Sequence, residues 1–172
     1  MKLPIRVIFS ATVASLLLVA CASKNTKPPA PAPAPAPAPT PAPAASSGKY
    51  TVESLDTDSC LRQRIVYFDF DKSEIRPEFE AAIACHAAYL QQFPGARVTL
   101  EGNADERGTR EYNLGLGERR GNAVSSALVA AGASPDQLNV VSYGEERPVC
   151  KEHNEACWQK NRRVEIVYTA KQ

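Results

Sequence analysis

Four short stretches of the chain have apolar patterns typical of β-strands, and two of them alternate between apolar and polar residues as half-buried strands do. These stretches are residues 65–70, 97–101, 139–143 and 162–169. In the second, Val98 and Leu100 share one face. In the last, Val164, Ile166 and Tyr168 alternate toward one side. The first is rich in β-branched and aromatic residues, which also favours a strand.

Between the first two strands, apolar residues recur every three or four positions, which predicts a helix. Pro77 suits the first turn of a helix, and the pattern runs to about Phe93, before Pro94 and Gly95 end it. Its predicted core stripe is Phe79, Ile83, Ala87 and Leu90.

A longer helix is predicted after Thr109, whose hydroxyl can cap the first free backbone N–H groups. Its apolar stripe is Leu114, Gly117, Gly121, Val124, Leu128 and Ala131. Gly117 and Gly121 allow close packing on a sheet, and Gly132 marks the end of the helix. Ser134 and Pro135 then open a short helical turn.

Alternating strands and helices predict a two-layer α/β domain of about 110 residues, beginning near Cys60 and covering residues 60–172. The formal net charge of +1 argues against a nucleic-acid-binding protein, which needs a concentrated basic face.

Residues 1–20 are typical of an export signal. Lys2 and Arg6 precede a mostly apolar run that is shorter than a membrane-spanning helix requires. The segment ends in Leu18-Val-Ala-Cys21, which resembles a bacterial lipobox, so Cys21 is the expected lipidation site. Several acyl chains together give lasting membrane anchorage. An ordinary signal peptide with an incidental cysteine is the alternative.

Residues 21–59 are predicted to be a linker. Residues 28–45 are almost entirely Pro and Ala, a composition that excludes a helix interior and favours an extended spacer of roughly 50 Å. A ligand for an aromatic groove on a partner is the alternative. The Ser-, Gly- and Asp-rich residues 46–59 are expected to be poorly ordered.

Four cysteines remain once Cys21 is set aside: Cys60, Cys85, Cys150 and Cys157. An even number in an exported chain indicates disulfides, and three pairings are possible. A short loop separates the last two, which favours Cys150–Cys157 and leaves Cys60–Cys85. The alternatives are a zinc site using His86 or His153, whose spacings match no usual motif, and a small core residue at Cys85.

Three polar side chains are predicted to converge where the second strand leads into the long helix. Asn113 and Arg120 lie two turns apart on one side of the helix, and Asp105 precedes its start. A carboxylate, an amide and a guanidinium suit a small zwitterion. Each has a plainer interpretation: Asp105 as a loop cap, Arg120 as part of a solvated face, and Asn113 as a surface residue.

The motif Gly102-x-Ala-Asp-x-x-Gly-Thr-x-x-x-Asn113, continued by Arg119-Arg-Gly-x-Ala-Val124, resembles the OmpA-like peptidoglycan-binding domain. Tyr67-Phe-Asp-Phe-Asp-Lys-Ser-Glu-Ile75, Ser142-Tyr-Gly144 and Asn161-Arg-Arg-Val164 extend the resemblance over about residues 65–168. It implies a βαβαβ-type domain with a mixed four-stranded sheet and helices on one face. One departure is Asn103, where many relatives carry His.

The resemblance implies that Asp105 and Arg120 hold the ammonium and carboxylate of meso-diaminopimelate in the wall stem peptide, with Asn113 and Asp71 beside them. It implies an outer-membrane lipoprotein that tethers this membrane to peptidoglycan, since Ala22 rather than Asp follows Cys21. It also implies docking to the β-propeller protein TolB, with the loop from Asp105 to Thr109 as the expected contact, and a role in envelope integrity and cell division.

Two alternatives remain at this stage. One is a wall-binding lipoprotein outside the Tol system. The other is a peptidoglycan hydrolase, which needs a spaced carboxylate pair, a Cys–His pair or a metal. Asp69 and Asp71 are close together, but no nucleophile, general-base His or calcium-loop spacing accompanies them. We therefore expect a binding protein that is not an enzyme and needs neither cofactor nor metal.

Overall fold

The computed structural model describes residues 50–172. The predicted signal segment, the lipidation site Cys21 and the Pro/Ala spacer lie outside the described residues. Among residues 50–172, no helix combines the length and the hydropathy needed to cross a membrane.

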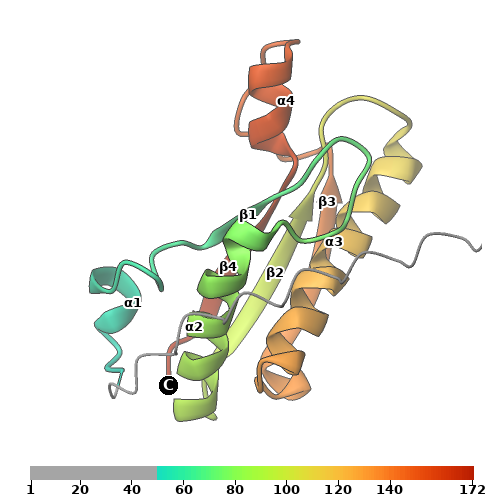
Figure 1. Cartoon of the computed structure of the whole chain (residues 1–172). Coiled ribbons are helices and arrows are strands. Elements are labelled where there is room, and N and C mark those ends of the chain that lie inside the picture. Colours follow the sequence, from blue (N-terminus) through green and yellow to red (C-terminus); the bar gives the residue numbers. More distant parts are fainter. Residues whose placement is uncertain (1–49) are drawn as a thin grey trace, which may run out of the picture. The chain divides into compact units, whose positions relative to one another are not determined.

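One four-stranded sheet organises the described residues, in the spatial order β1–β4–β2–β3 (Figure 1). The strands are β1 (Ile65–Tyr67), β2 (Arg97–Asn103), β3 (Leu138–Gly144) and β4 (Arg163–Ala170). β2 and β3 are parallel, whereas β4 runs antiparallel to both β1 and β2. The predicted mixed sheet is thereby confirmed. β1 ends at Tyr67, earlier than the predicted Phe70, and the chain beyond it passes through Asp71, which adopts a left-handed backbone conformation with φ 57°.

Two long helices cover one face of the sheet (Figure 1). The helices are α1 (Ser54–Thr57), α2 (Glu80–Gln92), α3 (Arg110–Ala130) and α4 (Glu155–Asn161), with 3₁₀ turns at Pro77–Phe79 and Pro135–Gln137. Thr109 caps α3 as predicted, since its hydroxyl accepts from the Tyr112 N–H at 3.2 Å. α4 was missed, because its seven residues are too short to show a helical period.

The core lies between the sheet and α2 and α3. The four predicted α2 residues are all buried, and so are Val98, Leu100, Val164 and Ile166 from the sheet. These residues form one continuous apolar cluster with Val124 and Leu128 of α3. The predicted two-layer arrangement is therefore present, and most of the residues that bury its core are those that the strand and helix periodicities indicated.

Close contact between α3 and the sheet depends on glycine. A Cβ added to Gly102 of β2 would lie 2.0 Å from the carbonyl oxygen of Gly117, and one on Gly121 would lie 2.6 Å from Val140. The predicted role of Gly117 and Gly121 is confirmed. Because α3 lies this close to the sheet, Arg120, which immediately precedes Gly121, reaches the carbonyl of Asn103 at the end of β2.

The buried face of α3 differs in part from the predicted stripe. Leu114 is only half-buried and Ala131 is exposed, whereas Leu116 is buried. The face instead includes Asn113 and Arg120. Apolarity alone misplaces the stripe because polar side chains occupy part of the buried surface.

Residues 50–59 are ordered, contrary to the expectation for the end of the linker. Tyr50 and Leu55 are buried in the core, and the Tyr50 N–H donates to Gln92 Oε1 at 2.8 Å. A single buried leucine in a four-residue helix leaves no periodic signal, so composition alone suggested a linker. The folded part therefore begins before the predicted boundary at Cys60.

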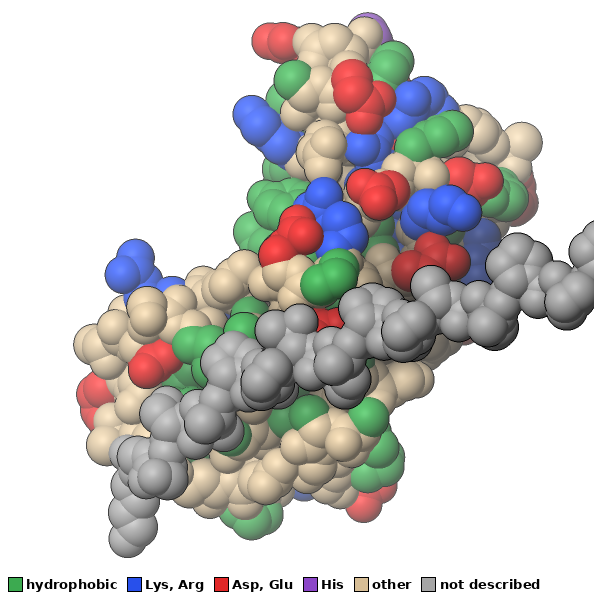
Figure 2. Space-filling view, viewed as in Figure 1, with side chains coloured by type: hydrophobic (Ala, Val, Ile, Leu, Met, Phe, Trp, Pro, Cys, Tyr) green, Lys and Arg blue, Asp and Glu red, His purple; other side chains and the backbone are tan. Residues whose placement is uncertain are grey.

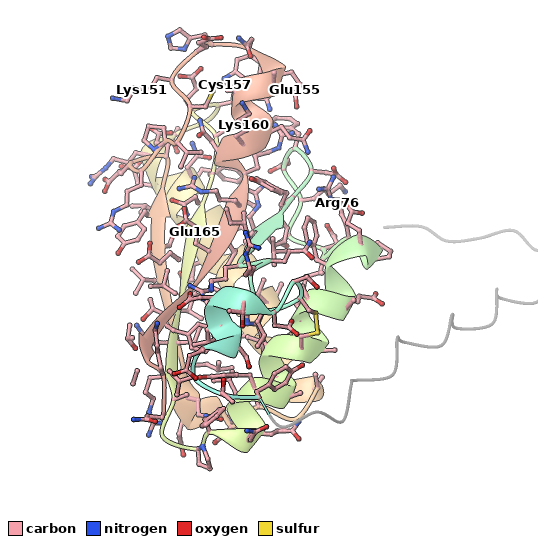
Figure 3. The ribbon with its side chains drawn as sticks, turned by 90° about the vertical axis from the view of Figure 1, so that its left-hand side faces the viewer. Arg76, Lys151, Glu155, Cys157, Lys160 and Glu165 are labelled. Atoms are coloured by element: carbon pink, nitrogen blue, oxygen red, sulfur yellow. A yellow bond between two sulfur atoms is a disulfide. The ribbon has the colours of Figure 1, made fainter. Side chains whose placement is uncertain are left out.

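Both favoured disulfides are present, Cys60–Cys85 and Cys150–Cys157. The first ties the start of the domain to α2, and the second fastens α4 to the loop that precedes it (Figure 3). The sulfurs of these four cysteines are bonded to each other, so they do not form the alternative zinc site.

His86 is a core residue rather than a metal ligand. Its side chain is completely buried, with Nδ1 2.9 Å from the Tyr168 hydroxyl and Nε2 3.2 Å from the Gln63 carbonyl oxygen. Burial lowers the pKa of His86 to about 4, because a charged imidazolium would lose its hydration.

We predict that this histidine makes the domain acid-labile. The folded-state pKa lies below the unfolded value, so the unfolded chain binds the proton first as pH falls. The contribution of neutral His86 to the free energy of unfolding is fully present above about pH 6.5. It is lost progressively toward pH 4, by about 3 kcal/mol at most. Denaturant unfolding between pH 7 and pH 4 measures this loss in the wild type and in His86→Gln.

The pH-dependent loss in the free energy of unfolding should shrink in His86→Gln, whatever its stability at pH 7. His153→Gln is the matched control, because the His153 side chain is 80% exposed. Parallel pH profiles for the wild type and His86→Gln contradict the prediction.

Candidate functional site

A cavity of about 200 Å³ opens where β2 leads into α3. Figure 2 shows basic and acidic side chains interleaved in this part of the domain, near α4 and the start of α3. The cavity is lined by Phe70, Asp71, Asp105, Arg107, Gly108, Tyr112, Asn113, Leu116, Arg120 and Arg162. All four residues predicted as ligand-binding, Asp71, Asp105, Asn113 and Arg120, are among them.

Asp105 lies at the centre of an ion-pair cluster and is only 4% exposed. Its Oδ1 accepts from the backbone N–H and the Nε of Arg107, at 3.0 and 3.2 Å. Its Oδ2 accepts from Arg107 Nη2 at 2.7 Å and from Arg162 Nη1 at 3.2 Å. Burial alone would raise the pKa of Asp105, but the hydrogen bonds from Arg107 and Arg162 outweigh it and hold the pKa below its ordinary value.

Arg120 forms the floor of the cavity and has no exposed surface. Nε donates to the Lys72 carbonyl at 2.8 Å, Nη1 to that of Asn103 at 2.9 Å, and Nη2 to that of Asp69 at 3.0 Å. Burial, with Arg162 nearby, lowers the pKa of Arg120 to about 10, so it stays charged at neutral pH.

The backbone contacts of Arg120 limit what it can offer a ligand. A guanidinium has five N–H groups, and three already bind carbonyl oxygens. Among residues 50–172, the other two, one on each terminal nitrogen, have no hydrogen-bond partner. The same residue therefore shapes the cavity and supplies its positive charge, whereas the sequence suggested only the second role.

Asp71 and Asn113 lie at the mouth and the wall of the cavity. The left-handed conformation of Asp71 directs its carboxylate to the Tyr112 hydroxyl, which donates to it. That hydrogen bond raises the pKa of Tyr112. Asn113 is 1% exposed and donates through Nδ2 to Glu145. The side chains of Asp71 and Asn113 are thus held by neighbours, as a preformed site requires.

Arg107 is sandwiched between two aromatic rings at the rim. Its guanidinium carbon lies 4.0 Å from the centre of the Phe70 ring and 4.2 Å from that of Trp158 on α4. Such cation–π contacts add to its ion pairs with Asp105 and Glu155. Phe70 is 54% exposed, so the rim carries an apolar surface beside the charges.

Arg162 connects the cavity to α4. It is 3% exposed, and donates to the Phe68 carbonyl at 3.0 Å and to Glu155 at 2.7 Å in addition to Asp105. Glu155 and Cys157 both lie on α4 (Figure 3), so the Cys150–Cys157 disulfide, which fastens this helix, supports the pair of Arg162 and Glu155.

Sequence reasoning missed Arg107, Arg162, Phe70 and Tyr112 as lining residues. A signal existed for Arg162, which lies in the motif Asn161-Arg-Arg-Val164, but nothing in local spacing places it beside Asp105, 57 residues earlier. The loop after Asp105 was expected to be exposed throughout. Glu106 is exposed, but Asp105 is buried and Arg107 is half-buried.

Asn103 does not line the cavity. It is 1% exposed, its backbone carbonyl accepts from Arg120, and its Nδ2 donates to the Glu101 carbonyl at 2.9 Å. Its side-chain Oδ1 has no hydrogen-bond partner among the described residues.

The cavity thus places carboxylate and guanidinium groups around a small space, with an amide in its wall. Asp105 and Asp71 can accept from an ammonium, and Arg120, Arg162 and Arg107 can donate to a carboxylate. This chemistry suits binding of a small zwitterion.

Residues 67–162 match the OmpA family. A Pseudomonas aeruginosa protein named peptidoglycan-associated lipoprotein is 44% identical over 155 residues, covering 90% of this chain and 91% of that protein. A Pseudomonas putida protein of the same name is 53% identical over 114 residues, covering 66% of this chain and 68% of that protein.

The fold is shared with a solved structure, the peptidoglycan-associated lipoprotein from Burkholderia pseudomallei. The two superpose with a TM-score of 0.65 at 44% identity, over 67% of this chain and 98% of the other. The resemblance drawn from the sequence is confirmed: the chain belongs to the OmpA family, among relatives named peptidoglycan-associated lipoproteins.

Proposed function

We propose that this chain binds peptidoglycan non-covalently, by holding the meso-diaminopimelate of the stem peptide in the cavity at Asp105. The observation that carries the proposal is the convergence of Asp71, Asp105, Asn113 and Arg120 on one cavity. The names of its relatives, which associate them with peptidoglycan, support it.

Diaminopimelate offers an ammonium and a carboxylate on one carbon at its free end. The ammonium pairs with Asp105, whose depressed pKa keeps it ionised. The ligand carboxylate accepts hydrogen bonds from the two N–H groups of Arg120 that do not bind backbone carbonyls. Both ligand charges lose water on entering, so each needs a charged partner in the cavity.

The wider function follows from the segments before residue 50. A lipidated Cys21 anchors the chain in the outer membrane, and the Pro/Ala spacer lets the domain reach the wall. The chain thereby tethers membrane to wall. Its resemblance to peptidoglycan-associated lipoproteins supports a further role in the Tol–Pal system, in envelope integrity and cell division, with TolB as its protein partner. A wall-binding lipoprotein outside the Tol system is the second candidate.

Sedimentation with purified sacculi tests the binding proposal. We expect the full-length protein, kept in detergent, to pellet with the sacculi and to release no soluble fragments. Steady release of muropeptides would instead identify a wall-cleaving enzyme. Failure to pellet at low ionic strength, where charge pairing is strongest, contradicts binding.

Two substitutions test the site itself. Asp105→Asn keeps the shape of the side chain but removes the charge facing the ammonium. Arg120→Ala removes the donor for the carboxylate. Charge-assisted hydrogen bonds are worth about 1.5–3 kcal/mol each, so either change should weaken wall binding at least about tenfold.

Arg119→Ala is the matched control, because Arg119 is exposed and lies about 100° around α3 from Arg120. Arg120→Ala also leaves three backbone carbonyls without their donor. Binding is therefore compared at temperatures below the unfolding transition of every variant. Loss of wall binding in Arg119→Ala but not in Arg120→Ala contradicts the assignment.

The partner proposal is tested by capture of purified TolB on the immobilised full-length protein. Glu106 is the exposed carboxylate of the loop after Asp105, so Glu106→Ala should weaken capture by a few-fold. Glu118→Ala on the exposed side of α3 is the control. Recovery of wall fragments but never of TolB favours the second candidate.

A further inference from the structure

Asp105 has all of its acceptor positions filled within the protein. A carboxylate offers about four lone-pair positions, and Asp105 accepts four hydrogen bonds: three from Arg107 and one from Arg162. An ammonium can bind this carboxylate only if one of these donors leaves.

The two arginines differ in how easily they can leave. Arg162 is 3% exposed and is also held by Phe68 and Glu155, so it is fixed. The Arg107 side chain is 30% exposed at the rim of the cavity. Two of its three bonds to Asp105 come from the guanidinium. The guanidinium of Arg107 is therefore the donor that can be displaced.

The surroundings of Arg107 can receive it after displacement. Phe70 and Trp158 contact both faces of its guanidinium, and Arg107 Nη1 lies 3.4 Å from Glu155 Oε2. A small sliding movement between the rings would release Asp105 and keep the existing Glu155 partner, so the Arg107 charge is never left without a counter-charge.

We propose that Arg107 is a built-in competing cation, which occupies the ammonium position at Asp105 and which a ligand must displace. The inference rests on the proposed function. A simple amine that binds Asp105 breaks the Arg107–Asp105 ion pair and forms an amine–Asp105 pair of similar strength, so the net gain in binding free energy is small. An amino-acid head group also brings a carboxylate for Arg120, so a zwitterion gains from binding where a plain amine does not.

Two matched small probes test this competition at Asp105. meso-Diaminopimelate and cadaverine share five carbons and two amines, but cadaverine lacks both carboxylates. Calorimetric titration of the full-length protein in detergent micelles measures the affinity for each. We expect the wild type to prefer meso-diaminopimelate at least about tenfold.

Arg107→Gln removes the competing charge while keeping a planar donor. An ion pair at the cavity rim is worth about one factor of five in affinity. Because both ligands displace the same guanidinium, cadaverine and meso-diaminopimelate should each bind Arg107→Gln about fivefold more tightly than the wild type, with the ratio between them unchanged. Arg107→Lys, which retains the charge, should restore the wild-type affinities.

Arg110→Gln is the control for net charge, because Arg110 is exposed and pairs with Glu146 outside the cavity. Unchanged or weaker cadaverine binding in Arg107→Gln overturns the inference. So does a selective loss of meso-diaminopimelate affinity, which would make Arg107 a direct carboxylate partner. If the wild type binds neither probe nor sacculi, the proposed function fails instead.

Discussion

A buried guanidinium holds the site together. Arg120 is fully enclosed, and a buried charge is stable only when its hydrogen bonds are made. Its donors bind carbonyls at Asp69 and Lys72, in the segment between β1 and α2, and at Asn103, the last residue of β2. Two separate parts of the sequence are thus fixed around one side chain of α3, and Asp71 lies within the first of them.

The second constraint is electrostatic order around that cation. Asp105 lies between Arg107 and Arg162, and Glu155 pairs with both arginines. Because these charges alternate in sign within a small volume, each keeps its partner in place, and a ligand must substitute for an existing partner. The disulfide at Cys157 fastens α4, which carries Glu155. The chain therefore presents a preformed site, where a looser one would lose affinity to the ordering of side chains.

Much of this could be read from the sequence, for physical reasons. Burial on one face imposes regular spacing, so β2, β4, α2 and α3 were predicted within a few residues, and small residues at Gly117 and Gly121 revealed close packing. The segments that were not predicted are short or polar. α1, α4 and the buried part of the loop that begins at Asp105 carry no periodic signal. Arg120 was predicted to be a binding residue, but its structural role depends on carbonyls about 50 residues away in the chain. Local spacing cannot indicate such contacts.

The most direct measurement is a crystal structure of the protein bound to a muropeptide that contains meso-diaminopimelate. The expected result places the ligand ammonium within hydrogen-bonding distance of Asp105 and its carboxylate against Arg120, with the Arg107 guanidinium moved away from Asp105. A muropeptide bound at another surface, with the pairs around Asp105 unchanged, would contradict the assignment of this cavity as the wall-binding site.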